Sequence, residues 1–107
     1  MSHDSSVARR HVEITNEYGL HMRPASKFAK LAGQFHSEIR VLHDGKEING
    51  KSILDLTLLA AESGTSLLLV AHGPDAEAAL EALSQLVLSD EFRKDKDNDI
   101  LGREASA

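Results

Sequence analysis

The stretch that decides the fold lies at residues 39–49 and reads IRVLHDGKEIN. Its first apolar residues alternate with charged ones, which is typical of a strand with one buried face. Asp44-Gly45 then predicts a tight hairpin turn, because both central positions of such a turn take a positive φ. Residues 46–49 are the predicted return strand, so the middle of the chain is expected to form an antiparallel pair.

Outside the hairpin, apolar residues recur with two different periods. Alternation at residues 12–14 predicts a strand, and i, i+3, i+4, i+7 spacing from residue 25 predicts a helix that ends near Gly33. The pattern is completed by a short apolar segment at residues 53–61, a buried strand at 67–71, and a long helix at 76–87 with Asp75 as its N-cap. The order β-α-β-β-α-β-α predicts an α+β domain whose antiparallel sheet is covered by helices on one face.

Length and composition are those of one globular domain: 107 residues, 41% hydrophobic and 27% charged. We expect a flexible N-terminal extension at residues 1–9, the domain itself at residues 10–89, and a charged, mobile tail at residues 90–107. Within that tail, Ile100 and Leu101 offer little apolar surface to bury. The formal charge of −5 argues against nucleic-acid binding, because phosphates repel an acidic surface.

Three features that the sequence lacks indicate in which cellular compartment the protein works. The chain has no cysteine, which excludes disulfides. Residues 1–10 lack the apolar stretch of a signal peptide, and the longest apolar run, at residues 67–71, is too short to span a bilayer. The sequence therefore predicts a cytoplasmic protein that does not insert into a membrane.

The most informative chemistry lies in Gly19-Leu20-His21-Met22-Arg23-Pro24-Ala25-Ser26, where a loop meets the first predicted helix. Pro24 suits the first turn of a helix, which places His21 at or next to the N-cap. Helix N-termini bind anions, and Arg23 adds a guanidinium suited to phosphate oxygens. A neutral imidazole, with a pKa of about 6.5, is a competent nucleophile near pH 7. The residues alone leave two interpretations of His21: a phosphoryl acceptor or an ordinary loop histidine.

This segment resembles the active-site signature Gly-Leu-His-x-Arg-Pro-Ala of the HPr family, the histidine-containing phosphocarriers of the bacterial phosphoenolpyruvate-dependent sugar phosphotransferase system. A second stretch, Asn49-Gly50-Lys51-Ser52-Ile53, resembles the regulatory-serine region of that family, and the resemblance spans about residues 10–88. It implies an open-faced β-sandwich, with a four-stranded antiparallel sheet and three helices on one face. It also implies a phosphoryl carrier rather than an independent enzyme, and we expect neither a cofactor nor a metal.

The resemblance implies a role for individual residues. Enzyme I would pass phosphate from phosphoenolpyruvate to Nδ1 of His21, and an enzyme IIA domain would receive it. Arg23 would steady the phosphate during transfer. The implied partner surface, on a chain expected to be monomeric, consists of Met22, Ser26, Ile53, Leu54 and Leu58.

The same resemblance leaves a second function open. Some members of the family serve a nitrogen-type or transport-independent branch, in which the phosphorylation state of a regulatory binding module controls target proteins. The signature residues do not separate this branch from sugar uptake.

Ser52 has two compatible interpretations. Ser52-x-x-Asp55 matches a capping box, which predicts that the serine caps the short helix. The resemblance also implies phosphorylation of Ser52 by an ATP-dependent HPr kinase/phosphorylase. Asp55, one turn along the helix, would repel that phosphate. Asp55 is also acidic where many relatives carry a basic or small residue, so the choice of partners in the sugar pathway stays open.

Two further patterns point to other functions and are discounted. The remaining histidines, which are His3, His11, His36, His43 and His72, lack the paired spacing of a metal site. Gly45-x-x-x-x-Gly50-Lys51-Ser52 spells the Walker A pattern, but an Asp-Gly hairpin lies inside it, where a P-loop enzyme needs a phosphate-binding loop. We therefore interpret this match as chance and reject a P-loop nucleotide enzyme.

Overall fold

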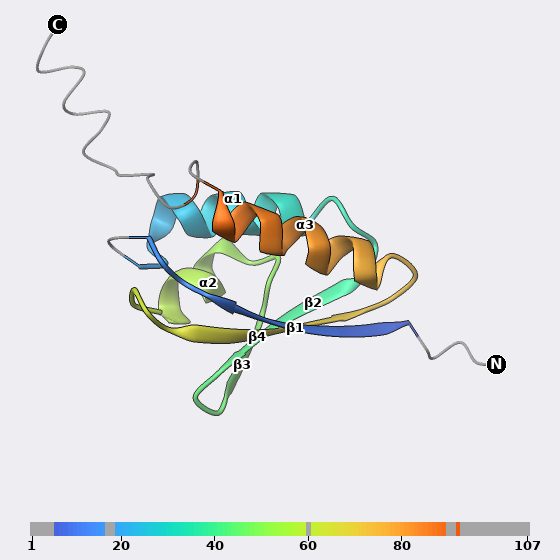
Figure 1. Cartoon of the computed structure of the whole chain (residues 1–107), viewed down its shortest axis with the longest axis horizontal. Coiled ribbons are helices and arrows are strands. Elements are labelled where there is room, and N and C mark those ends of the chain that lie inside the picture. The colour runs from blue at the N-terminus through green and yellow to red at the C-terminus, as the bar shows by residue number, and fades with distance from the viewer. Residues whose placement is uncertain (1–5, 17–18, 60, 90–91, 93–107) are drawn as a thin grey trace, which may run out of the picture.

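The computed structural model describes residues 6–16, 19–59, 61–89 and 92, which form a four-stranded antiparallel sheet and three helices (Figure 1). The strands are β1 (Val7–Glu13), β2 (Glu38–His43), β3 (Lys46–Asn49) and β4 (Ser66–His72), and the helices are α1 (Met22–Ala32), α2 (Ile53–Leu59) and α3 (Ala76–Leu88). This order confirms the predicted α+β domain, with the helices on one side of the sheet (Figure 1). Within the described ranges, no helix has both the length and the apolar character needed to cross a bilayer.

Strand β4 is one of the two inner strands of the sheet, in agreement with its apolar run. The strand order is β1-β4-β2-β3, so β4 pairs antiparallel with β1 on one side and with β2 on the other. Leu67, Leu69 and Ala71 are buried against the helices, whereas Leu68 and Val70 lie half-buried on the opposite, open face. A strand flanked on both sides can bury residues on both faces, which explains its nearly continuous apolar sequence.

The turn between β2 and β3 confirms the predicted hairpin. His43 pairs with Lys46, which leaves a two-residue loop. Asp44 and Gly45 have φ values of 54° and 81°. These are the positive values that a tight hairpin requires and that aspartate and glycine tolerate better than most residues.

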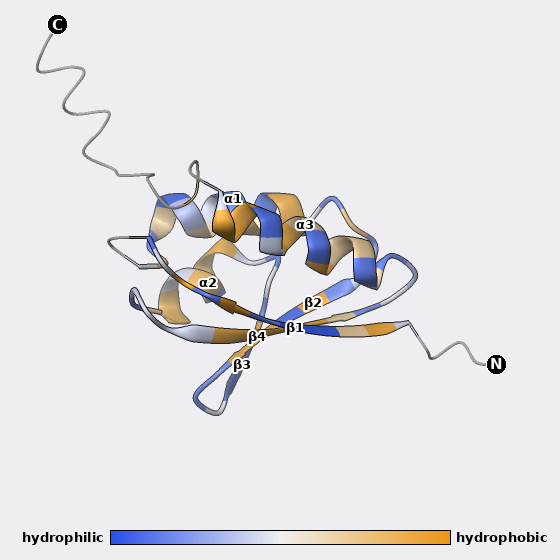
Figure 2. Cartoon of the chain, in the orientation of Figure 1, coloured by the Kyte–Doolittle hydropathy of each residue, from blue (hydrophilic) through white to orange (hydrophobic). Residues whose placement is uncertain are grey.

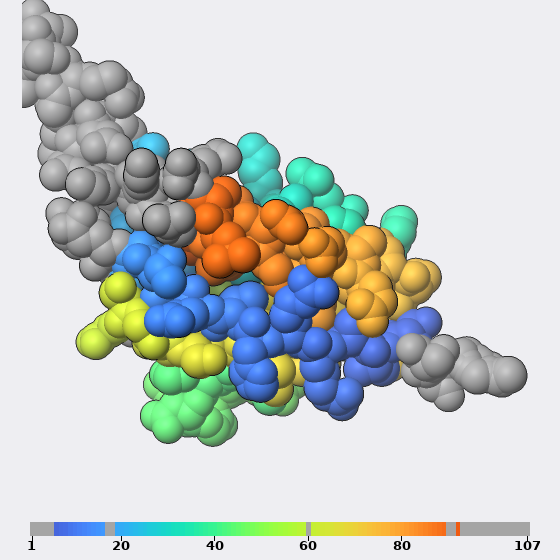
Figure 3. All heavy atoms as spheres, viewed as in Figure 1, coloured from blue at the N-terminus to red at the C-terminus, as the bar shows by residue number. Residues whose placement is uncertain are grey.

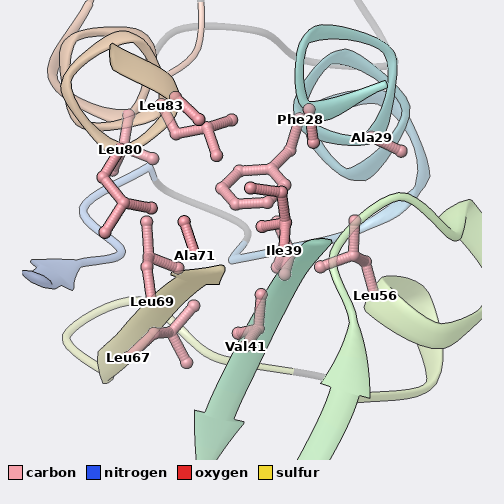
Figure 4. Packing of buried hydrophobic residues seen from close by; sticks show 14 of the residues in the cluster. Phe28, Ala29, Ile39, Val41, Leu56, Leu67, Leu69, Ala71, Leu80 and Leu83 are labelled. Atoms are coloured by element: carbon pink, nitrogen blue, oxygen red, sulfur yellow. The ribbon is translucent and has the colours of Figure 1, made fainter. Parts of the chain in front are cut away.

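The core lies between the sheet and the helices. Phe28 from α1 and Leu80 and Leu83 from α3 point toward Ile39 and Leu69 of the sheet (Figure 4). Each of these five side chains is at most 2% exposed. Truncation of one such residue to alanine typically costs about 2–5 kcal/mol, so this cluster holds the two layers together.

The first strand begins earlier than predicted. It starts at Val7 and takes in residues 7–9, which the sequence assigns to the extension. Ala8 is buried opposite Ala71 of β4, and Arg9 beside it is exposed. A single buried alanine among polar residues carries little hydrophobic signal, which hides this strand start in the sequence. Residues 1–5 of the predicted extension lie outside the described residues.

Phe92 is fully buried, although it follows the predicted end of the domain. Its N–H donates to Oγ of Ser89, at 3.2 Å, and that hydroxyl donates to the carbonyl of Leu86, at 2.6 Å. An isolated aromatic residue among charged ones shows no periodicity, so the pattern analysis does not detect it. The rest of the predicted tail, residues 90–91 and 93–107, lies outside the described residues.

Asp75 occupies the N-cap position of α3, but its side chain makes no capping hydrogen bond, so this detail of the prediction is wrong. Its carboxylate instead accepts hydrogen bonds from the N–H groups of His36 and Ser37, each at 2.9 Å, and from the Ser37 hydroxyl. The Ser37 hydroxyl, followed by the His36 N–H, lowers the pKa of Asp75 from 3.8 to about 2. The carboxylate therefore ties the segment before β2 to the start of α3.

Candidate functional site

The loop that leads into α1 is fixed by contacts to a distant segment. The N–H of Leu20 donates to the carbonyl of Ala61 at 2.7 Å, and the buried Asn16 amide donates to the carbonyl of Gly19. Gly19 has a φ of 77°, and a Cβ there would lie 2.6 Å from the Ala61 carbonyl oxygen. The two hydrogen bonds and the close approach to Ala61 hold the backbone immediately before His21 in place. Glycine is the residue that fits this position.

His21 is the N-cap residue of α1, as predicted. Its backbone is extended, with φ −95° and ψ −167°, and its carbonyl accepts a hydrogen bond from the N–H of Ala25 at 2.9 Å. Its side chain makes no capping hydrogen bond, unlike the Ser, Thr, Asp or Asn residues usually found at this position. The imidazole therefore does not cap the helix as those side chains do.

One ring nitrogen of His21 is buried. The residue as a whole is half-buried, and its Nε2 atom is buried. A reactant brought by another protein has to touch the nitrogen with which it reacts. Nε2 is covered by this chain and is closed to such an approach.

The start of α1 favours an anion. The helix has 11 residues and no acidic side chain in its first turn, so its N-terminal N–H groups and dipole present positive charge next to His21. Arg23 is the second helical residue and is half-exposed, and Lys27 follows one turn later. Pro24 lies buried in the first turn, as its missing N–H predicts. This arrangement can accommodate a dianion beside the imidazole.

An exposed apolar surface adjoins this region on two neighbouring helices. Met22 of α1 is 61% exposed, and on α2 Leu54 and Leu58 are 66% and 69% exposed, with Ile53 at 42%. Helices α1 and α2 contact each other, and Figure 2 shows the hydrophobic residues of α2. Large apolar side chains left in water on a small domain mark an interaction surface.

Two residues need separate mention with respect to this surface. Ser26, which the resemblance also places there, is half-buried on α1. Leu88 at the end of α3 is 64% exposed and was not anticipated, because the helical pattern of α3 predicts only which side is buried.

Ser52 caps α2, and half of the predicted capping box is present. Oγ of Ser52 accepts a hydrogen bond from the N–H of Asp55 at 3.1 Å. The reciprocal half of the prediction is wrong, since the Asp55 carboxylate accepts from the N–H of Asn49, at 3.4 Å, rather than from that of Ser52. The N–H of Ser52 is instead used by the turn before the helix and donates to the carbonyl of Asn49.

The Walker A match has none of the geometry of a phosphate-binding loop. Strand β3 lies inside the matched stretch, and the helix that follows has seven residues. Nζ of Lys51 donates to the carbonyl of Phe35 at 2.8 Å, so this ammonium ties two parts of the fold together. Gly50 packs where a Cβ would lie 2.6 Å from Cγ2 of Ile39, which gives its presence a structural reason.

The other histidines do not gather into a metal centre in the part of the chain that the structure describes. No group of three or more His, Cys, Asp or Glu side chains there could hold a metal ion. His3 lies outside the described residues.

Comparison with known proteins agrees with this fold. A family model described as "PTS HPr component phosphorylation site" matches residues 8–89. The chain belongs to the HPr family. It is accordingly a phosphocarrier protein of the phosphotransferase system, a carrier of phosphoryl groups rather than an enzyme.

Three relatives illustrate the similarity. The phosphocarrier protein HPr of Neisseria meningitidis is 42% identical over 81 residues, which cover 76% of this chain and 91% of that protein. The crystal structure of HPr-C-His from Thermoanaerobacter tengcongensis matches with a TM-score of 0.75 at 36% identity and covers 83% of this chain and 98% of its own. The crystal structure of the Bacillus subtilis protein Crh, described as a swapped dimer, has a TM-score of 0.62 at 42% identity and covers 71% and 87%. The Neisseria HPr and Crh thus have the same percentage identity to this chain.

Proposed function

We propose that this chain accepts a phosphoryl group on Nδ1 of His21 from enzyme I, charged by phosphoenolpyruvate, and passes it to an enzyme IIA domain for sugar uptake or its regulation. The observation that carries the proposal is the geometry of His21. The imidazole stands at a helix N-terminus, makes no capping hydrogen bond, and has Nε2 covered. Because Nε2 is buried, we assign the reaction to Nδ1.

The transfer step follows from this arrangement. The lone pair of Nδ1 in the neutral ring attacks the phosphorus of the donor, and a bond from Nδ1 to phosphorus forms. The bond from the donor atom to phosphorus breaks, and its electron pair stays with the donor. The reverse sequence returns the phosphoryl group to an acceptor. The proposed step uses the neutral tautomer whose ring proton is on Nε2. No proton therefore has to be removed from Nδ1 first.

Arg23 and the helix dipole support transfer by countering the negative charge of the phosphoryl group. The dipole contributes about 0.3–1 kcal/mol at an exposed site, so the guanidinium is the larger influence. Modest stabilisation suits a carrier, since a phosphoryl group held tightly could not be passed on. Met22, Ser26, Ile53, Leu54 and Leu58 form the proposed surface on which enzyme I and the enzyme IIA domain dock in turn.

Ser52 is a proposed site of regulation by an HPr kinase/phosphorylase. Its side chain is half-exposed and follows the turn before α2, next to exposed Ile53 and Leu54. A phosphate there would put a dianion beside the apolar docking surface and close to the Asp55 carboxylate. We expect such a phosphate to weaken docking and slow transfer to His21.

A second candidate function is favoured by the similarity to Crh, which matches the relatives named HPr in percentage identity. In that case the chain is a regulatory binding module whose phosphorylation state controls target proteins. Either role places the chain in the cytoplasm, and we propose that it works there as a monomer.

Incubation with enzyme I and phosphoenolpyruvate tests the proposal. We expect acid-labile phosphate on the wild-type chain, none on His21→Ala, and undiminished labelling of His72→Ala, an exposed histidine at the end of β4. Labelling of His21→Ala at the wild-type level, or no labelling of the wild type, would contradict it.

A further addition separates the two roles. A phosphorylated chain that loses its label to an enzyme IIA domain is a relay component. A chain that becomes phosphorylated but passes nothing on, and that binds a target only in one phosphorylation state, is the regulatory module.

A further inference from the structure

A groove of about 260 Å³ runs between β1 and the C-terminal half of α3. Figure 3 shows these two elements meeting along one face of the molecule. The groove combines apolar and charged side chains from both elements, namely Arg10, His11, Val12, Glu13, Ser84, Val87 and Leu88. It is separate from the start of α1 and from α2, so it belongs to neither the His21 site nor the proposed docking surface.

One side of the groove can accept an added segment. Among the described strands, β1 pairs with β4 and stands at the edge of the sheet. Edge strands present main-chain N–H and carbonyl groups to an added extended segment. Leu88, which is 64% exposed, adds apolar surface at the end of α3.

The chain itself supplies a segment of the right kind and reach. Phe92 is anchored in the fold a few residues beyond Val87 and Leu88, and residues 93–107 follow it. Extended, residues 93–101 span up to about 30 Å. The 13 residues of α3 are about 20 Å long, so every part of the groove is within reach. This segment lies beyond residues 8–89, which the family model matches.

The sequence of this segment contains one apolar anchor. Ile100 and Leu101 are its two large aliphatic residues, and charged or small residues surround them. We propose that the groove binds this C-terminal segment in extended form along the open edge of β1, with Ile100 and Leu101 against Val12 and Leu88. The groove offers these two side chains a site of burial that composition alone does not reveal. The proposal is independent of phosphorylation at His21.

Amide NMR spectra of the full-length chain test this docking. The variant Ile100→Asp/Leu101→Asp should shift the resonances of residues 10–13 and 84–88 and speed hydrogen exchange of the β1 edge amides at least threefold. The matched control Ala105→Asp/Ala107→Asp adds the same two charges to the same segment and should leave those resonances in place. Leu88→Ser, a change at an exposed position of the groove, should reproduce the effect of the first variant.

Other occupants give different results. Coincident spectra of the two double variants at residues 10–13 and 84–88 would overturn the proposal. So would groove resonances that shift with protein concentration equally in both variants, because a second copy then fills the groove. Because the proposed contact is apolar, it should persist in 0.5 M NaCl, and its loss there would assign the attachment to ion pairs instead.

Discussion

At the scale of single residues, position 21 is an N-cap whose side chain makes no capping hydrogen bond. A Ser, Thr, Asp or Asn at an N-cap typically stabilises a helix by about 1 kcal/mol relative to a residue that cannot cap. The His21 imidazole makes no such bond, while the main chain around it is firmly held through Gly19 and Ala61. A reactive residue requires such a firmly held backbone, and the imidazole is not committed to capping the helix.

His21→Ser should therefore stabilise the fold while abolishing phosphoryl acceptance. The serine hydroxyl can accept a hydrogen bond from the first turn of α1, and we expect a gain of about 0.5–1 kcal/mol in the free energy of unfolding. Urea denaturation monitored by circular dichroism measures it. A loss of stability would show that the imidazole has a structural role after all.

Arg23 should influence the rate of transfer more than the stability of the fold. Hydrogen bonds to charged groups contribute about 1.5–3 kcal/mol, so Arg23→Met should slow phosphorylation by enzyme I about tenfold to a hundredfold. The measurement is the rate at which phosphate from phosphoenolpyruvate appears on the chain in the presence of enzyme I. Lys30→Met removes the same charge from the exposed last turn of α1 and is the control. Equal rates for the two variants would mean that the guanidinium has no specific role.

At the scale of elements, the sequence predicts what depends on local pattern. The hairpin at Asp44-Gly45, the inner strand β4 and the amphipathic α1 all lie where periodicity and turn chemistry place them. The start of β1 was missed because its buried residue is the small Ala8, and Phe92 was missed because it stands alone among charged residues.

Contacts between distant segments were also beyond sequence reasoning. The local pattern predicts Asp75 as a helix cap, but its carboxylate accepts hydrogen bonds from the N–H groups of His36 and Ser37, which are distant in sequence. The hydrogen bond from the N–H of Leu20 to the carbonyl of Ala61, which fixes the loop before His21, also joins distant segments. Both depend on which segments the sheet brings together, and no local pattern encodes that.

The Asp75 contacts predict a specific dependence of stability on pH. Its pKa is about 2 in the folded chain, against an ordinary value of 3.8, because hydrogen bonds favour the ionised carboxylate. Its contribution is therefore fully present above about pH 4 and is lost as the pH falls toward 2. Across this window, the Tm of the wild type should fall more steeply than that of Asp75→Asn.

Asp44→Asn is the matched control for this measurement, since it makes the same chemical change at an exposed turn position that asparagine also tolerates. Its Tm should follow the wild-type pH curve. Parallel curves for wild type and Asp75→Asn would contradict the role assigned to the carboxylate.

At the scale of the whole molecule, the fold gathers the functional features at one end. Figure 1 places the start of α1 and the end of α3 at the same end of the molecule, with α2 below them. The start of α1, proposed to accommodate the phosphoryl group, and the exposed apolar residues of α1 and α2 thus lie on one rigid support, the core that contains Phe28 and Leu83. A partner that docks on the apolar residues can meet His21 without any rearrangement of the sheet.

The signature around His21 is sufficient to predict the family. It does not distinguish a relay to sugar transport from a regulatory branch, because that choice depends on which proteins the surface binds. Met22, Leu54 and Leu58 show that there is a surface to bind. Apolar exposure alone does not encode the identity of the partner.

The most direct test of the central claim is where the phosphoryl group becomes attached. Chain labelled with ¹⁵N in its histidine rings, phosphorylated by enzyme I and phosphoenolpyruvate, should show coupling between ³¹P and Nδ1 of His21, because Nε2 is buried. Coupling to Nε2, or phosphate on any other residue in place of His21, would contradict the account.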